Sequence, residues 1–490
     1  MKALLEPIKE IARFDELFRD LKKGTAGVTV ISGCLESQKA HMIAGLSEDA
    51  PVRLLIAENE LKAKELYEDY RLYDAETLYY PAKDLIFYQA DIHGNLLIRQ
   101  RLQVIQALLE RKEVTIITSV GGCMDFLLPL GVFEKHCIHL RNDSEFDLDK
   151  IRKELVRLGY ESTFQVESTG QFSVRGGILD IYPLTEQNPI RIELWGDEID
   201  SIRSFDAESQ RSIENLEEIT IYPASELILT ENTIARGVKA IKKEAKAQST
   251  KFRDKMMTEE AARIRHAAEE ICDQIGEGEI LQGAEQYLHY FYPETVSFLE
   301  YLPENSRIFL DEPNRIIECA DALEAEFQES VSHRLEKGYL LPGQAKLMCS
   351  TAELVAKLNR RGCVAVSLME PQKGEWNIRD EFSVTVKSVN SYNNQFPLLV
   401  KDLKSWKKAG YRIVLASPSR TRAQHLAEDL QNEEIPAFYS ENEERVLKPG
   451  EVMLIHGAAR RGFEYPMQKF VLITETDIFG KEKKKNRKKS

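Results

Sequence analysis

Short β-rich runs alternate with helical segments along the first 120 residues. Strands are expected at Val28–Ser32, Val52–Ala57 and Val114–Ser119, with helices at residues 39–46, 59–72 and 96–111. Strands separated by helices predict a parallel sheet joined by right-handed crossover connections. This part of the chain is therefore expected to form an α/β domain.

The pattern changes near residue 140, and a chain of 490 residues is too long for one ordinary domain. A helix at 149–158 leads into short strands at 172–182, 190–195, 199–205 and 219–222, and a long helical stretch follows at 233–276. Strands and helices alternate again from residue 366. We expect an α/β multi-domain protein divided into residues 1–139 (parallel-sheet domain, first part), 140–224 (small β-rich module), 225–365 (parallel-sheet domain, second part, with long helices), 366–480 (second small α/β domain) and 481–490 (basic linker or tail).

Charge and cysteine content exclude several classes of protein. The net charge is −14, and the last ten residues hold seven Lys or Arg and one Glu, so the other 480 carry −20. Such an acidic body is a poor general binder of nucleic acid. The seven cysteines form no CxxC pair and read as reduced thiols. No apolar run approaches the roughly 20 residues of a membrane span. These features predict a cytoplasmic protein without membrane contact.

A loop with the position and length of a phosphate-binding loop follows the first strand. It runs from Gly33 to Ala40 in the pattern G-x-x-x-x-G-K-[ST], but Gln38 replaces the second glycine and Ala40 lacks the hydroxyl that holds Mg²⁺. Lys39 is retained. We therefore expect a vestigial nucleotide site without ATP hydrolysis. The alternative is an ordinary strand–turn–helix with an exposed lysine.

No other constellation predicts catalysis. Asp311 and Glu312 follow an apolar strand, where related folds place an acidic pair that binds Mg²⁺, but they are more simply a strand-end pair, one of which caps the next helix. His136 and His139 flank Cys137 without an acidic ligand, and no metal site is expected. Neither HExxH nor G-x-S-x-G occurs, so no catalytic residues are assigned.

Two segments carry a specific resemblance. Residues 170–183 read GQFSVRGGILDIYP, and residues 190–206 read IRIELWGDEIDSIRSFD, followed by Ser209-Gln210-Arg211-Ser212. Together they resemble the module shared by the UvrB family and the transcription-repair coupling factor (Mfd) family, which docks onto UvrA. UvrB keeps an intact phosphate loop and a DNA-inserting hairpin. The degenerate loop here, with residues 79–84, 99–101, 309–313 and 470–480, is more similar to Mfd.

The Mfd resemblance spans roughly residues 20–480 and implies a UvrB-homology region plus one small domain. Members of that family continue into an RNA-polymerase-interacting domain, two ATP-driven DNA translocase domains and an autoinhibitory C-terminal domain. RNA polymerase, double-stranded DNA, ATP and magnesium would then be used by those missing parts. The chain itself is expected to be non-catalytic and free of cofactors, either as an engineered piece or as a naturally short protein.

The module suggests how a partner would bind. Ile190, Ile192 and Leu194 alternate with Arg191, Glu193 and Trp195, so Arg191 and Trp195 should share the outer face of a strand. Arg175 lies on the preceding strand, beside Gly176-Gly177, where a bulge or a close backbone approach is expected. Arginine with an aromatic residue suits carboxylates on a protein partner.

The resemblance assigns Arg175 and Arg191 to UvrA contact, with Trp195 where the family usually has Phe. Alternatively, each arginine pairs with a carboxylate such as Glu193 or Glu198, and Trp195 is core. The acidic residues Asp180, Asp197, Asp200 and Asp206 are expected to fix turns.

The last domain gives fewer signals. Ser417 or Ser419 could cap a helix, and Arg460-Arg461 reads as a surface turn. The favoured function is recruitment of UvrA to RNA polymerase stalled at lesions. The alternatives are an active UvrB-like ATP-dependent DNA-damage enzyme and an unrelated acidic scaffold.

Overall fold

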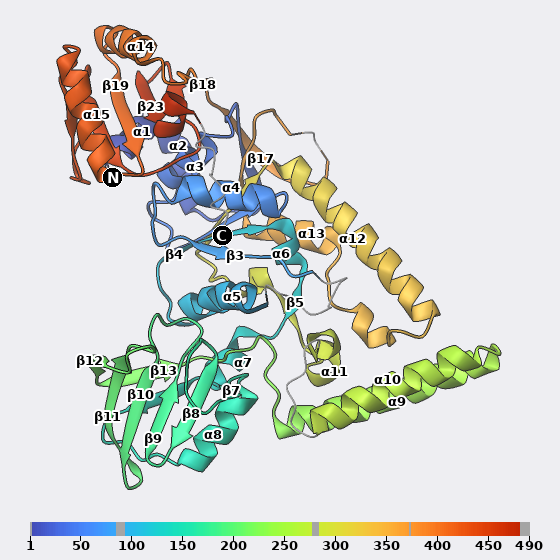
Figure 1. The fold of residues 1–490 in the computed structure, drawn as a ribbon. Helices are drawn as coiled ribbons and strands as arrows, with labels where there is room; N and C mark the ends of the chain where they lie inside the picture. Colours follow the sequence, from blue (N-terminus) through green and yellow to red (C-terminus); the bar gives the residue numbers. More distant parts are fainter. Residues whose placement is uncertain (1, 85–93, 277–283, 372–373, 481–490) are drawn as a thin grey trace, which may run out of the picture.

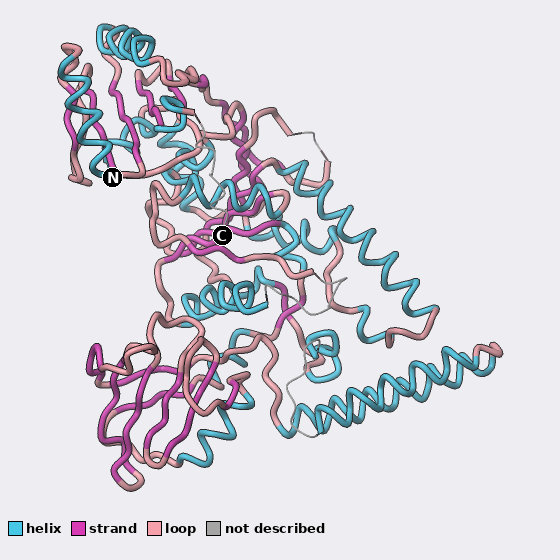
Figure 2. The backbone as a smooth tube through the Cα atoms, viewed as in Figure 1, coloured by secondary structure: helices cyan, strands magenta, loops and turns pink. Residues whose placement is uncertain are grey.

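The computed structural model describes residues 2–84, 94–276, 284–371 and 374–480 (Figure 1). The basic tail at 481–490 lies outside these residues. Strands gather into three larger sheets, with helices packed around them (Figure 2). The chain is thus an α/β multi-domain protein with a parallel sheet, as its sequence predicts.

The central sheet has seven strands in the order β17-β1-β16-β15-β2-β4-β3, and every pair is parallel. These strands are β1 (Val28–Ser32), β2 (Val52–Ala57), β3 (Leu78–Tyr80), β4 (Val114–Ser119), β15 (Arg307–Asp311), β16 (Cys363–Val366) and β17 (Ile378–Ser383). The three strands expected in the first 120 residues are present with the expected bounds. Their residues are almost all buried, because helices cover both faces of the sheet.

The start of the second α/β unit differs from the expectation. Residue 366 ends β16, and β17 pairs with β1, so both strands belong to the central sheet. The sequence of β17 gives little warning, because Ile378–Ser383 is a mostly polar edge strand. The second unit begins only at β18 (Lys387–Ser388).

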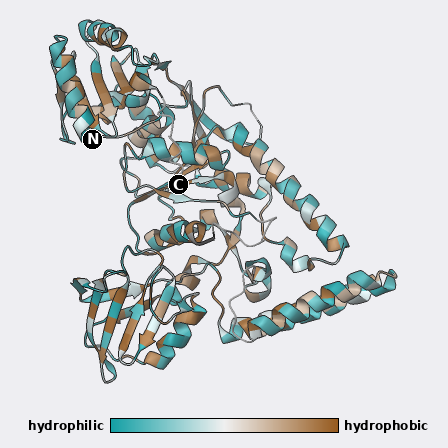
Figure 3. Cartoon of the chain, in the orientation of Figure 1, coloured by the Kyte–Doolittle hydropathy of each residue, from teal (hydrophilic) through white to brown (hydrophobic). Residues whose placement is uncertain are grey.

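Helices pack on the central sheet and against one another. They are α1 (Lys2–Lys9), α2 (Phe14–Lys22), α3 (Lys39–Gly45), α4 (Glu60–Tyr70), α5 (Gly94–Leu109), α6 (Val120–Met124), α7 (Leu130–Lys135), α11 (Leu288–Phe291), α12 (Pro313–Glu336) and α13 (Thr351–Arg361). Short 3₁₀ turns occur at Ala284–Tyr287, Phe298–Tyr301 and Pro342–Ala345, and β5 (Phe126–Leu127) pairs with β14 (Val296–Ser297). Hydrophobic residues concentrate on the strands and on the inward faces of these helices (Figure 3).

The β-rich module contains helix α8 (Leu148–Arg157) and a six-stranded sheet in the order β12-β11-β10-β9-β8-β7. The strands are β7 (Glu161–Ser162), β8 (Gln171–Arg175), β9 (Ile178–Ile181), β10 (Ile190–Trp195), β11 (Glu198–Phe205) and β12 (Ser212–Leu216). Next to them, β6 (Ile138–Arg141) pairs with β13 (Glu218–Ile221).

The segment expected as one strand at 172–182 is a hairpin. Gly176-Gly177 forms its turn between β8 and β9, so there is no bulge. The close backbone approach is confirmed, because a Cβ atom on Gly177 would lie 3.3 Å from the Leu194 carbonyl oxygen. Gly176 has φ 60°, a conformation that glycine adopts without strain, which lets the chain reverse in two residues.

The expected helical stretch at 233–276 is two antiparallel helices, α9 (Glu231–Asp254) and α10 (Thr258–Gly276), which project from the body as a hairpin (Figure 1). The reversal falls at Lys255–Met257, where Met256 has φ 62°. Lys and Glu residues continue through this turn, so the helical periodicity alone did not reveal it.

The second α/β unit has a six-stranded sheet in the order β18-β22-β23-β19-β21-β20. Its further elements are β19 (Arg412–Ser417), β20 (Ala437–Tyr439), β21 (Val452–His456), β22 (Phe463–Tyr465), β23 (Phe470–Thr474), α14 (Phe396–Lys408), α15 (Arg420–Asn432) and α16 (Glu475–Phe479). Ser419 caps α15 by accepting the Arg422 N–H at 3.3 Å, as expected. None of the helices in the described ranges has the length and apolarity needed to cross a bilayer.

Candidate functional site

The six-stranded sheet of the module has one buried and one open face. Ser173, Asp180, Arg191 and Arg203 lie opposite one another on successive strands, so they form a row on one face. Their neighbours along the strands, such as Leu179 and Ile192, point to the other face and are fully buried. We call the first side the outer face.

Asp180 organises this outer face. Its Oδ2 accepts hydrogen bonds from Arg175 Nη2 at 2.9 Å and from Arg191 Nη2 at 2.8 Å, while its Oδ1 accepts from Arg191 Nε at 2.7 Å. The carboxylate is almost completely buried in the middle of β9. The expectation that Asp180 fixes a turn is therefore wrong, because the turn precedes β9. Asp206 does fix a turn, accepting the Ser209 N–H at 2.7 Å.

The two arginines differ in accessibility. The Arg191 side chain is 14% exposed, stacks 4.4 Å from the Phe205 ring and donates to Gln210 at 2.8 Å. Its hydrogen bonds to Asp180 raise the pKa of the guanidinium. The Arg175 side chain is 39% exposed. Arg175 can therefore reach a partner directly, whereas Arg191 mainly holds Asp180 in place.

Trp195 is exposed, so its alternative placement in the core is wrong. It ends β10 beside the hairpin turn at Gly196 and is 82% exposed. The alternative that each arginine pairs with a neighbouring carboxylate is confirmed, but the carboxylate is Asp180 for both arginines, while Glu193 pairs with Arg203 at 2.5 Å. Arg191 and Trp195 occupy the alternating positions that place them on the outer face, as the sequence predicts.

Sequence reasoning missed two exposed apolar side chains of the module and one cation on the outer face. Phe164 is 86% exposed, and its carbonyl accepts the Ser173 hydroxyl at 2.7 Å, next to Asp180. Ile213 is also exposed and lies at the register shift of β12. The cation is Arg203, whose place in the row became clear only from the strand register. A Phe or Ile within a β-rich segment is the sequence signal that could have identified the two apolar side chains.

Comparison with known proteins gives one family match and several relatives. Residues 138–227 match the UvrB interaction domain family. The whole chain is similar to the transcription-repair-coupling factor of Bacillus subtilis (strain 168), with 32% identity over 97% of this chain and 41% of that protein. The corresponding factor of Staphylococcus aureus (strain USA300) is 30% identical over 100% of this chain and 41% of its own length.

The chain is therefore similar to part of the transcription-repair coupling factors of these two organisms. It spans about two fifths of the length of the curated relatives it matches. Within it, the open arginine-bearing sheet lies in the UvrB interaction domain, which contains Arg175, Arg191 and Trp195.

The loop from Gly33 to Ala40, which the sequence predicts to be a vestigial nucleotide site, is filled by side chains of the same chain. Lys39 is only 1% exposed, and its Nζ lies 2.7 Å from Asp311, 2.8 Å from Glu312 and 3.5 Å from Glu36. Burial by itself would lower the pKa of Lys39, but Asp311 and Glu36 raise it above its ordinary value. The alternative of an exposed lysine is wrong. The helix-cap role is wrong too, since Glu312 occupies the N-cap position with φ 58° but makes no side-chain cap bond.

The second α/β unit closes this loop. Gln38 Nε2 donates to Tyr465 Oη at 2.5 Å, and the Ser37 hydroxyl donates to the Gly462 carbonyl at 3.3 Å. A Cβ atom built on Gly33 would lie 2.2 Å from the Val384 carbonyl oxygen, so backbone packs directly on that glycine. Ala40 is buried and offers no hydroxyl. These residues do not fit a magnesium nucleotide.

Arg460 also joins the two α/β units, which corrects its interpretation as a surface turn. Its Nε and Nη2 donate to Asp69 Oδ2 at 2.9 and 2.8 Å, and its backbone N–H donates to Asp69 Oδ1 at 2.7 Å. Its Nη1 lies 2.8 Å from Glu65. Sequence alone could not pair residues so far apart.

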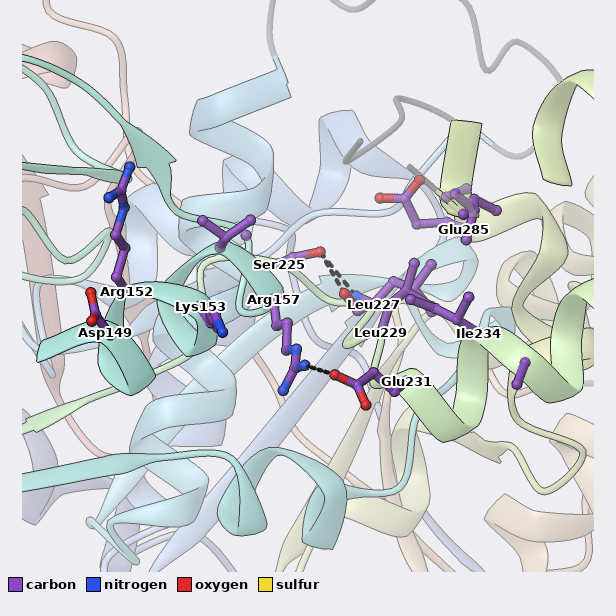
Figure 4. Close-up of a pocket in the computed structure, with 16 residues that line it drawn as sticks. Asp149, Arg152, Lys153, Arg157, Ser225, Leu227, Leu229, Glu231, Ile234 and Glu285 are labelled. Atoms are coloured by element: carbon purple, nitrogen blue, oxygen red, sulfur yellow. Dashed lines mark hydrogen bonds and ion pairs between the residues drawn. The ribbon is translucent and has the colours of Figure 1, made fainter. Parts of the chain in front are cut away.

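A cavity of about 840 Å³ lies between α8 and the start of α9 (Figure 4). Arg152, Lys153 and Arg157 line it from α8, and Arg157 forms an ion pair with Glu231. Within the described ranges, no group of His, Cys, Asp and Glu is arranged to hold a metal ion.

Proposed function

We propose that this chain recruits UvrA, the damage-recognition ATPase of nucleotide excision repair, through the outer face of its UvrB interaction domain. The observation that carries the proposal is the exposure of Arg175 and Trp195 on a sheet within that domain. The remaining parts of a coupling factor would bring this surface to stalled RNA polymerase. The role is therefore recruitment.

The chemistry of the face supports a protein partner with carboxylates. The Arg175 guanidinium can fork onto a partner carboxylate while Asp180 anchors one edge of it. Trp195 offers a large planar surface with few rotatable bonds. A central arginine and an exposed aromatic residue have the composition of an interface hot spot.

The test is a calorimetric titration of the chain into purified UvrA, with Trp195→Ala and Arg175→Ala as variants. We expect each to weaken binding by at least about tenfold, or about 1.4 kcal/mol, because each removes one anchor of the interface. The matched controls are Tyr339→Ala and Arg265→Ala, which truncate exposed residues outside the domain and should leave the affinity unchanged.

The result also separates the alternatives. Unchanged affinity in both face variants would exclude this site, and no binding by the parent chain would favour an unrelated acidic scaffold. Loss in the controls as well would indicate an indirect effect on folding.

We further propose that the chain neither binds nor hydrolyses ATP. The support is that Asp311 and Glu312 form ion pairs with Lys39 and that Tyr465 accepts a hydrogen bond from Gln38 of the loop. A fluorescent ATP analogue with magnesium should show no saturable binding. Binding lost in Lys39→Ala would instead favour an active UvrB-like enzyme.

A further inference from the structure

One helix carries a positive stripe on an otherwise acidic protein. Of the seven exposed cations on α9, six form this stripe, and none of the six has an ion-pair partner among the described residues; they are Arg236, Lys239, Lys242, Lys243, Lys246 and Arg253. At about 100° per residue they fall within an arc of about 120°. They cover about 25 Å along the helix. The stripe is therefore a continuous surface and not scattered charge.

The stripe borders the side of α9 that packs on α10. The buried residues Ile241 and Ala245 lie away from the centre of the stripe, and Ser249 lies beside its edge. The Ser249 hydroxyl donates to the Ala261 carbonyl of α10 at 3.0 Å, so this side packs on α10. In turn, Arg263 of α10 donates to the Lys337 carbonyl at the end of α12. The hairpin rests on the body through both helices, because Arg236 of α9 donates to the Phe291 carbonyl of α11 and Arg263 of α10 contacts the end of α12. The lysines of the stripe, farther along α9, remain exposed.

No carboxylate interrupts the stripe between its two ends. Glu244 lies on the flank of α9, where it accepts a hydrogen bond from the Tyr290 hydroxyl. Glu231 and Asp254 mark the two ends of the helix. Charges beyond about 8 Å are largely screened at physiological ionic strength, so the distant part of the acidic body has little effect on the field at this surface. The carboxylates of α10, such as Glu269 and Asp273, belong to the same hairpin.

We propose that the exposed face of α9 binds the phosphate backbone of duplex DNA without reading its sequence. Four of the six cations are lysines, which act as point charges and need no matching geometry to meet phosphates. A protein partner would instead need aromatic or arginine anchors, and α9 exposes no large hydrophobic side chain. This favours nucleic acid over an acidic protein.

The cavity at the foot of α9 is lined by three cations of α8 and by the carboxylates Asp149, Glu231 and Glu285. Arg152 and Lys153 on α8 are exposed at its rim, next to the start of α9 (Figure 4). A duplex lying along α9 would therefore meet further cations where the hairpin joins the UvrB interaction domain. This surface is separate from the outer face around Arg175 and does not depend on the proposed binding of UvrA.

The experiment measures fluorescence anisotropy of a labelled duplex of about 25 base pairs in 50 to 200 mM salt. The variant is K239E/K243E/K246E. Its matched control is K401E/K404E/K408E, which reverses three exposed lysines on α14 and changes the net charge equally. We expect the α9 variant to bind at least about tenfold more weakly and to lower the salt slope by about 3, while the control stays within about twofold of the parent. All three proteins keep residues 481–490, so the tail cannot explain a difference.

Several outcomes would overturn the proposal. They are no binding by the parent chain at 50 mM salt, equal loss in both variants, and competition by polyglutamate as effective as competition by unlabelled duplex. The last would indicate an acidic protein partner. Should the reversed variant fail to fold, K239Q/K243Q/K246Q replaces it, with retained helical circular dichroism as the requirement. UvrA affinity, measured in parallel, should be unchanged, which keeps this result distinct from the recruitment test.

Discussion

Asp180 connects the two arginines of the outer face, so substituting either arginine also affects this carboxylate. It is a nearly buried carboxylate that depends on two guanidinium groups, and Arg191 supplies two of its three hydrogen bonds to arginine. A change at Arg191 therefore acts on the module as well as on a partner, whereas Trp195 touches little of the module.

We predict that Arg191→Ala destabilises the chain by about 2–3 kcal/mol, because it leaves a buried carboxylate with one partner. Trp195→Ala should leave the stability unchanged within about 0.5 kcal/mol. Thermal unfolding measures both effects. Adding Asp180→Asn to Arg191→Ala should recover part of the loss, because it removes the unpaired charge; a double variant less stable than Arg191→Ala would contradict this account.

His41 provides a pH-dependent contact between the two α/β units. Its Nε2–H donates to the Leu4 carbonyl at 2.6 Å, and its Nδ1 accepts from the Tyr465 hydroxyl at 3.1 Å. Burial lowers the pKa of His41 to about 4, so the folded protein keeps the ring neutral where the unfolded chain would protonate it.

This contribution to stability is complete above about pH 6.5 and is lost as pH falls toward 4, because the unfolded state then binds one more proton. Between pH 7 and pH 5 the loss from this residue should be about 2 kcal/mol. His41→Gln does not titrate, so its unfolding free energy should fall by that much less over the same interval. If the unfolding free energies of the two proteins fell equally between pH 7 and pH 5, His41 would not be the group responsible for the loss.

At the scale of elements, the α9–α10 hairpin is fixed to the body near its base. A Cβ atom on Gly237 would lie 2.2 Å from Cδ1 of Phe291, which is fully buried in α11. The close approach explains a glycine inside a 24-residue helix, where it otherwise disfavours the helix.

Gly237→Ala should therefore destabilise the chain by about 1–3 kcal/mol through overpacking, despite the better helix propensity of alanine. Gly131→Ala is the matched control, because Gly131 lies inside α7 with nothing within 4 Å of its added Cβ atom. It should be neutral or slightly stabilising. Chemical denaturation measures both changes. Equal changes in the free energy of unfolding would show that helix propensity alone determines the effect of each substitution.

The elements themselves were predictable where burial is uniform. The strands β1, β2 and β4 are continuous apolar runs, and their bounds followed from the sequence. The turns at Gly176 and Met256 were not found, because the residues around each continue the same periodicity. The polar strand β17 was placed in the wrong unit, because its partner β1 lies 350 residues earlier.

The candidate site shows the same division between local and distant information. Alternation along β10 placed Arg191 and Trp195 correctly on one face. It could not show that Asp180 joins Arg191 to Arg175, nor that Lys39 lies against Asp311, 272 positions away. The net charge did not indicate the positive stripe on α9, because a sum over 490 residues does not record where the charges lie.

At the scale of the whole molecule, the loop from Gly33 to Ala40 also joins the two α/β units. Gln38, which stands where a phosphate loop needs glycine, donates to Tyr465 of the second unit. Arg412 adds two hydrogen bonds to Glu10, both at 2.7 Å. This loop is therefore part of the interface between the two units.

Arg460→Ala should loosen that interface. It removes two side-chain hydrogen bonds from Asp69, which is nearly buried and whose pKa is already raised by burial. A loss of about 2–4 kcal/mol is expected, because a buried carboxylate then keeps only the backbone N–H of residue 460. The loss should concentrate at the interface, since neither sheet is altered internally.

Hydrogen exchange should therefore increase in α3, α4 and β22 and remain unchanged in the UvrB interaction domain. Arg461→Ala is the control, because that side chain is exposed and donates mainly to Ser391 within the second unit. UvrA affinity should be the same in all three proteins, since the outer face lies on a separate sheet. A uniform rise in exchange across the central sheet would instead mean that Arg460 supports the whole fold and not the contact between its two units.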